Sequence, residues 1–150
     1  GNSDIHDPDL LLQSSSQSHR TMTLVFATDR TLDAVKEALL AKRTVVWFQD
    51  QLIGRREYLE PLFYGSVQVK QPILRSGTNV RMQIHNSCQA DIQLARTGGV
   101  GPRAITLPAH STVLVEITTA APDTPLDLRY TATNFLVAPD TGLPVVLTTD

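Results

Sequence analysis

The stretch VRMQIH, residues 80–85, decides the fold. Its apolar residues Val80, Met82 and Ile84 alternate with polar ones, which is the period of a β-strand with one buried and one solvated face. Short alternating segments of the same kind follow to the end of the chain, separated by turn residues. An antiparallel immunoglobulin-like β-sandwich is therefore predicted for residues 66–150.

Toward the N-terminus, the pattern changes from β alone to mixed α and β. The run TMTLVFA, residues 21–27, predicts a strand because it is rich in β-branched and aromatic residues. Thr31 can then cap a helix that extends from residue 32 to about residue 42. One apolar stripe of this helix is formed by Leu32, Val35 and Leu39.

A second strand and a second helix are expected before the sandwich. TVVWFQ, residues 44–49, predicts the strand, and DQLIG after it predicts a turn in which Gly54 is free to adopt a positive φ. RREYLEPLFYG, residues 55–65, has apolar residues at helical spacing, but Pro61 lies inside the pattern. A helix that is short, starts late or is kinked is expected there. The fold class is thus α+β, mainly β.

Composition limits the functions that the chain can have. Its 150 residues allow one domain, or one domain with an appended fragment, and its net charge of -2 argues against binding to nucleic acid or an anionic membrane. No apolar run approaches the roughly 20 residues that cross a bilayer, and the polar N-terminus is not a signal peptide. A soluble protein, cytoplasmic or periplasmic, is expected. Cys88 is the only cysteine, so an intramolecular disulfide is excluded.

The first six residues, GNSDIH, contain the best candidates for a metal site. Asp4 and His6 are two positions apart, so both can face one ion from an extended segment or a tight turn. Two ligands alone do not hold a metal tightly. Residues 7–20 predict a flexible connector, and the leucines at 10–12 are costly to expose, so they pack either on the body of the chain or on something outside it.

Other candidate groups favour structural roles. His19, His85 and His110 have no second ligand at a suitable spacing, and Cys88 has no cationic neighbour to stabilise a thiolate. No Gly-x-Ser-x-Gly motif supports a catalytic triad. TGGVGPR, residues 97–103, lacks the Lys-Ser/Thr and the following helix of a phosphate loop, so it predicts a strand connection.

Four aromatic residues could form either an interaction cluster or part of the core. They lie on a predicted strand and a predicted helix of a small domain, where core packing is the more common role. The residues are Trp47, Phe48, Phe63 and Tyr64.

The N-terminal half resembles a known family. In order, SDIH, MTLVFAT, DAVKEALLAKRT, VVWF and LIGRREYLEPLF are similar to the C-terminal end of bacterial phosphoesterases of the PHP (polymerase and histidinol phosphatase) family, in the phosphodiesterase-like subgroup with an extra C-terminal β-domain. The resemblance covers roughly residues 1–66, and the β-domain matches mainly in architecture. The family segment ALxxxRT corresponds to Ala38, Leu39, Arg43 and Thr44.

The resemblance implies a metal site of which this sequence contains only some of the ligands. Family members hold two or three divalent ions in a distorted β/α barrel, and their last ligand motif, Ser-Asp-x-His, corresponds to residues 3–6. Asp4 and His6 would then be metal ligands. The earlier ligand motifs are missing from this sequence, so no metal is expected to bind tightly to this chain.

The resemblance also implies a division of the chain and a function. Residues 1–20 would be the end of the barrel and a linker, 21–65 an α/β segment, and 66–150 an accessory β-sandwich domain. The chain would be the C-terminal accessory region of a metal-dependent phosphoesterase, inactive alone, with the barrel of the same polypeptide as its partner and a parent that could form homo-oligomers. The alternative is a non-enzymatic immunoglobulin-like binding or interaction module, in which Asp4 and His6 are incidental. A small catalytic domain acting alone is disfavoured because no complete nucleophile or acid–base set is present.

Overall fold

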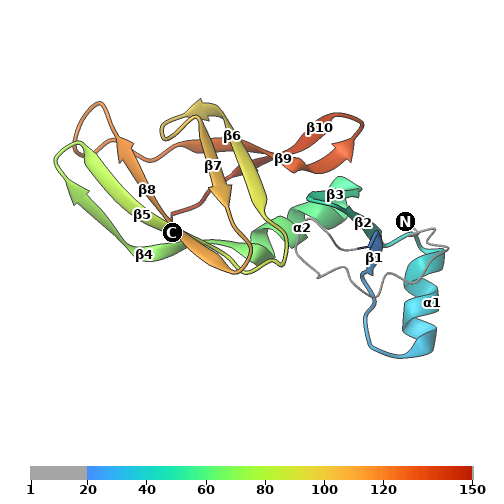
Figure 1. The fold of residues 1–150 in the computed structure, drawn as a ribbon. Coiled ribbons are helices and arrows are strands. Elements are labelled where there is room, and N and C mark those ends of the chain that lie inside the picture. Colours follow the sequence, from blue (N-terminus) through green and yellow to red (C-terminus); the bar gives the residue numbers. More distant parts are fainter. Residues whose placement is uncertain (1–19, 150) are drawn as a thin grey trace.

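The computed structural model describes residues 20–149 and confirms a mainly β fold of the α+β class (Figure 1). The predicted flexible N-terminus, including Asp4 and His6, lies outside the described residues except for residue 20. In chain order, the elements are β1 (Met22–Val25), α1 (Leu32–Leu40), β2 (Thr44–Phe48), β3 (Gln51–Gly54), α2 (Arg56–Ser66), β4 (Val67–Ser76), β5 (Asn79–Asn86), β6 (Ile92–Gly99), β7 (Ala104–Leu107), β8 (Ser111–Thr118), β9 (Leu128–Ala138) and β10 (Thr141–Val146).

The sandwich forms as the alternating pattern predicts. Val80, Met82 and Ile84 of β5 are at most 1% exposed, whereas Arg81 and Gln83 between them face solvent. β5 lies between β4 and β8 in a three-stranded antiparallel sheet. The buried side of this sheet packs on the side chains of a second, larger sheet to form one hydrophobic core.

The larger sheet branches at β9. Its order is β1-β2-β3-β9-β6-β7, and β10 pairs with β9 as an additional strand. The first half of β9 pairs with β6, through Leu94 and Ala132 among others, whereas its second half pairs with β3, through Leu52 and Phe135. The β3–β9 pair is parallel, so the sheet as a whole is mixed and not purely antiparallel.

Asn134 connects the strands at this branch point. Its side chain is almost fully buried, and its Nδ2 donates to the carbonyl oxygens of Asp50 and Asp91, each at 2.7 Å. Its Oδ1 accepts a hydrogen bond from the amide of Gln93 at 3.0 Å. The predicted segments 21–65 and 66–150 therefore share one sheet, and their division into domains stays a prediction.

Helix α2 covers one face of the β2–β3 part of the sheet. Leu59 and Phe63 of α2 are fully buried, and the ring of Phe63 meets the ring of Phe135 edge to face, with centroids 5.7 Å apart. The helix begins at Arg56 and continues through Pro61 to Ser66, so it is short, as predicted, and the alternative of a late start is wrong. Burial of two large side chains, worth roughly 1.5–3 kcal/mol each, offsets the hydrogen bond that a proline removes.

The predicted turn at residues 50–54 is also wrong. The chain reverses at residues 49 and 50, where Gln49 has a φ of 53°, and β3 begins at Gln51. Gly54 ends this strand without a positive φ. A Cβ added at Gly54 would lie 2.8 Å from Cγ2 of Val45, so a close approach of the neighbouring strand requires the glycine.

Candidate interdomain surface

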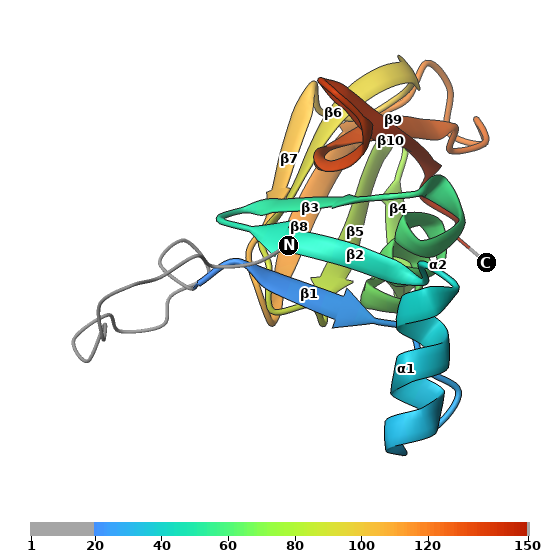
Figure 2. The ribbon, with the colours of Figure 1, turned by 90° about the vertical axis from the view of Figure 1, so that its right-hand side faces the viewer.

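Helix α1 directs large apolar side chains into solvent. It lies at the end of the molecule remote from the sandwich, next to β1 (Figures 1 and 2). The exposed fractions of its three leucines, here called the leucine ridge, are 68% for Leu32, 48% for Leu39 and 84% for Leu40. The apolar stripe of Leu32, Val35 and Leu39 that the sequence predicts is therefore not the face that α1 buries.

The buried face of α1 is instead made of small residues. Ala38 is fully buried, and Ala34 and Val35 are partly buried. Because successive residues are about 100° apart around a helix, these residues and the leucine ridge occupy different sides of α1. The helix thus has apolar groups on two sides, of which only one is buried against the rest of the described protein. Leu39 followed by Leu40 was the sequence signal for this second side, since two adjacent leucines cannot both face one sheet.

Arg43 fixes α1 to the neighbouring strand. Its Nε donates to the carbonyl oxygen of Phe26 at 3.1 Å, and its guanidinium makes a two-point contact with the carboxylate of Glu37. The hydrogen bond with Glu37 is the main cause that raises the pKa of Arg43 above its ordinary value. The conformation of α1 is thereby defined even though few of its side chains are buried.

A hollow lies next to the C-terminal end of α1. It has a volume of about 690 Å³ and lies on the side of β2 and β3 that faces away from α2. The register aligns Val46, Ile53 and Leu136 across three strands, and all three line the hollow. Lys42 and Arg55 also line it, and Lys42 is two residues beyond the last residue of α1.

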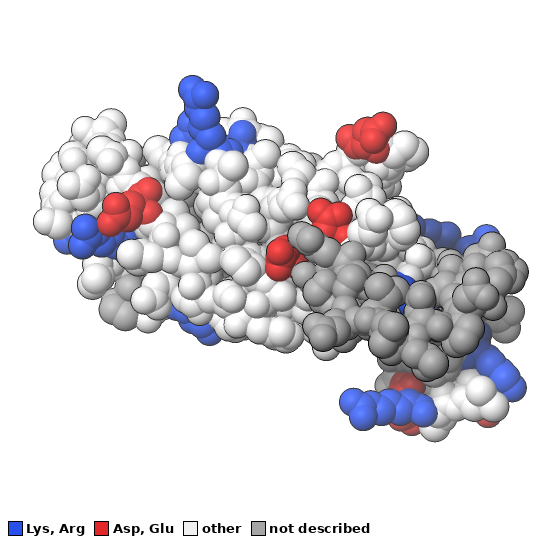
Figure 3. Space-filling model, in the orientation of Figure 1, with Lys and Arg blue, Asp and Glu red and all other residues white. Residues whose placement is uncertain are grey.

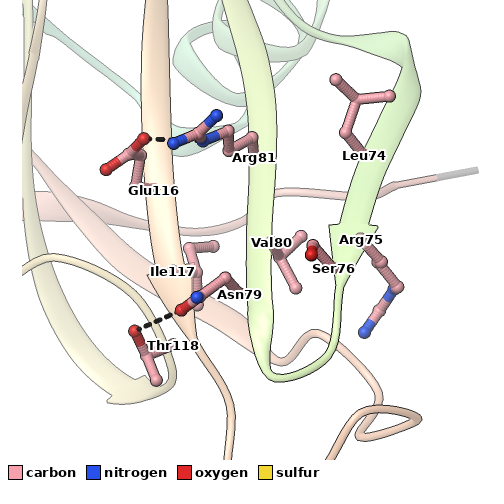
Figure 4. Close-up of a pocket in the computed structure, with 9 residues that line it drawn as sticks. All are labelled: Leu74, Arg75, Ser76, Asn79, Val80, Arg81, Glu116, Ile117 and Thr118. Carbon is pink, nitrogen blue, oxygen red and sulfur yellow. Dashed lines mark hydrogen bonds and ion pairs between the residues drawn. The ribbon is translucent and has the colours of Figure 1, made fainter.

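A second hollow, of about 470 Å³, lies on the sandwich between β4, β5 and β8 (Figure 4). Arg81 and Glu116 in it form an ion pair at 2.8 Å. Arg75 donates to the carbonyl oxygens of Pro122 and Thr124. These charged groups thus already have partners within the protein.

The predicted metal ligands cannot be placed. Asp4, His6 and His19 lie outside the described residues, so the assignment of Asp4 and His6 to a metal stays a prediction. Within residues 20–149, no three His, Cys, Asp or Glu side chains come together as a metal site would require. His85 lies in β5 with its Nδ1 3.0 Å from the hydroxyl of Thr112, and His110 is exposed in a turn with a φ of 52°.

The glycine-rich segment is a strand connection, as predicted. It spans the end of β6 and the turn to β7, and Gly99 and Gly101 have φ values of 68° and 110°. The hydroxyl of Tyr130 donates to the carbonyl oxygen of Pro102 at 3.1 Å and holds this turn against the core. Burial raises the pKa of the Tyr130 phenol, and the charge of Arg96 opposes this effect in part.

The four aromatic residues divide between core and surface. Trp47 and Phe63 are buried, as predicted. Phe48 and Tyr64 are 43% and 41% exposed, so the prediction of a core role is wrong for them. Both wrong assignments have the same cause, because each exposed residue directly follows a buried one and must point elsewhere.

Charge does not concentrate on the side of the molecule that Figure 3 shows. Lys and Arg side chains alternate there with Asp and Glu side chains in small separate groups. Neither of the two described helices is long and apolar enough to cross a bilayer.

Comparison with known proteins identifies the family of the sandwich and a solved two-domain protein that is similar to most of the chain. The family DUF5001, described as an Ig-like domain, matches residues 67–148, more than half of the chain, and the chain belongs to this family. The chain is also similar to a solved two-domain protein from Bacteroides vulgatus that contains a predicted PHP-like metal-dependent phosphoesterase, with 34% sequence identity and a TM-score of 0.80. No curated protein matches the chain.

The second match extends beyond the Ig-like domain. It covers 87% of this chain, so it must include much of the α/β segment in addition to residues 67–148. It covers 39% of the Bacteroides protein, so the chain spans about two fifths of the length of that protein. The resemblance inferred from the sequence is thereby confirmed.

Proposed function

We propose that this chain is the C-terminal accessory region of a metal-dependent phosphoesterase, a phosphoric ester hydrolase, and that it is not catalytic on its own. The observation that carries the proposal is the 34% identity to the two-domain Bacteroides protein over 87% of this chain. A match of that extent includes both α/β and sandwich segments. The accessory region would then contribute packing and orientation to a neighbouring catalytic domain.

The described residues do not fit a metal site, because no suitable cluster of ligands is present among them. In this proposal, Asp4 and His6 are two ligands, and the catalytic domain of the same polypeptide supplies the others. Carboxylate and imidazole groups are ordinary ligands of divalent ions. Such ions, when bound, activate water toward a phosphate ester.

The test compares this chain with the natural polypeptide that contains it. We expect the polypeptide to hydrolyse bis(p-nitrophenyl) phosphate in the presence of Mn²⁺, and the 150-residue chain to give no turnover. Asp4→Asn and His6→Asn should each lower kcat/KM by roughly 100-fold or more, since loss of a metal ligand removes binding and chemistry together. His19→Asn, in the same predicted linker, is the matched control and should leave the rate unchanged.

Two results would contradict the proposal. One is turnover by the 150-residue chain alone. The other is a coding sequence with no phosphoesterase domain joined to this region. The second result would favour a non-enzymatic Ig-like binding module, for which the hollow of Figure 4 is the candidate surface because it lies on the sandwich itself.

A further inference from the structure

We propose that the leucine ridge of α1, continued by the hollow next to it, docks the phosphoesterase domain of the same polypeptide. This inference rests on the proposed function and adds to it the surface through which the two domains meet. The ridge consists of the exposed side chains of Leu32, Leu39 and Leu40.

The distribution of apolar groups around α1 shows that one of its sides lacks a covering surface among the described residues. A helix at the surface of a globular protein normally has a single apolar stripe, which faces the core. In α1, the side toward the sheet is already occupied by Ala38 and its small neighbours, and the leucines lie on another side. Leu40, at 84% exposed, is the most exposed of the large apolar residues in the described part of the chain.

The helix is held in a defined position before any partner binds. Arg43 connects its C-terminal end to Phe26 and Glu37, and Thr31 caps its N-terminal end through the amide of Ala34. An ordered apolar surface loses little conformational entropy on binding, which favours a docking role over a segment that folds only on contact.

Two observations identify the occupant as a domain of the same polypeptide. First, the similar Bacteroides protein has two domains, and the match to it includes the α/β segment that carries α1. Second, β1 is the first described strand and lies next to α1 at the end of the molecule remote from the sandwich (Figure 1), so a domain joined before residue 20 would be tethered at this end. A tethered domain also needs only a small surface, because its effective concentration is high.

Hydrogen exchange tests the docking directly. We expect backbone amides of residues 32–40 to exchange at least tenfold more slowly in the natural polypeptide than in the 150-residue chain. The double variant Leu39→Gln/Leu40→Gln should remove this protection in the polypeptide. The matched control, Leu74→Gln/Leu114→Gln, changes two leucines of similar exposure on the sandwich, at 61% and 59%, and should keep the protection.

The possible results separate the docking from the proposed function. Equal exchange of α1 in the two proteins, in a polypeptide that hydrolyses phosphodiesters, overturns the docking and leaves the function intact. Absence of a phosphoesterase domain from the polypeptide overturns both. If α1 exchanges slowly in the 150-residue chain alone, and this protection increases with protein concentration, the leucine ridge binds a second copy of the chain and the docking is overturned. Unchanged exchange of β5 amides in the double variant verifies that the variant is folded.

Discussion

Tyr130 shows how one buried polar group can make stability depend on pH. The residue is 1% exposed, and its hydroxyl donates to Pro102 in the turn that follows β6. Burial raises the pKa of its phenol, with Arg96 acting in the opposite direction. The folded state therefore binds the phenolic proton more tightly than the unfolded state does. The free energy of unfolding must then fall as the pH rises above the pKa that the phenol has in the unfolded state.

The variant Tyr130→Phe tests this linkage. At pH 7 we expect the free energy of unfolding to decrease by about 1 kcal/mol, because a hydrogen bond is lost and both states are neutral at this position. Above pH of about 10, where the unfolded tyrosine ionises, the wild type loses stability that the variant keeps. The difference in the free energy of unfolding between the wild type and the variant, measured by urea titration, should shrink between pH 9 and 11. Parallel curves over that interval would contradict the assignment.

At the scale of elements, the local pattern determines most strands but not their partners. The alternation in residues 80–85 predicts β5 and its buried face, and turn residues predict where the sandwich strands end. β3 escapes prediction because it has four residues and is stabilised by β2 and by β9, a strand some eighty positions away in the sequence. Packing on a distant strand outweighs the local turn signal of its sequence.

Two glycines give opposite predictions about stability. Gly65 lies in α2, and a Cβ added to it would meet nothing within 4 Å, so Gly65→Ala should stabilise the fold by roughly 0.5–1 kcal/mol. Gly99 has a φ of 68°, and a Cβ there would lie 1.8 Å from the carbonyl oxygen of Asp127. Gly99→Ala should destabilise the fold by more than about 1 kcal/mol.

The midpoints of urea denaturation, measured for both glycine variants under the same conditions, check these signs. A shift of the Gly65→Ala midpoint to lower urea would mean that α2 does not accept a side chain at this position. A stable Gly99→Ala protein would mean that the turn can move away from Asp127.

At the scale of the whole molecule, the branch at β9 predicts that both segments unfold together. Trp47, the only tryptophan, lies in β2 and reports on the α/β segment by fluorescence, whereas circular dichroism reports mainly on the sandwich strands. We expect the two unfolding curves to coincide in the wild type.

The variant Asn134→Ala should lower the free energy of unfolding by roughly 1–3 kcal/mol. It removes the hydrogen bonds of the Asn134 side chain and leaves the buried amide and carbonyl groups of the neighbouring strands without a partner.

The matched control for this change is Thr133→Ala, at the exposed neighbouring position. It removes one exposed hydrogen bond, from the Thr133 hydroxyl to the carbonyl oxygen of Gln93 at 3.3 Å, and should lower the free energy of unfolding by less than about 1 kcal/mol. Two separate transitions in the wild-type protein would show that the shared sheet does not couple the segments.

The candidate site was less predictable than the fold. Asp4 and His6 were found by residue type and spacing, which are local properties, and they stay a prediction. The predicted stripe of Leu32, Val35 and Leu39 does not coincide with the buried face of α1, because helical periodicity locates an apolar stripe but does not show which side of the helix the sheet covers. Here the fully buried Ala38 marks the side of α1 that is covered.

The shared strand β9 also has a consequence for how such a protein can evolve. Its second half pairs with β3, so a recombination break at residue 66 would separate Phe135 and Leu136 from their backbone partners. The exposed strand edge would then be free to pair with other chains, which promotes aggregation. Selection should therefore keep residues 21–65 with the Ig-like domain when genes are rearranged, and the two segments should be inherited as one unit.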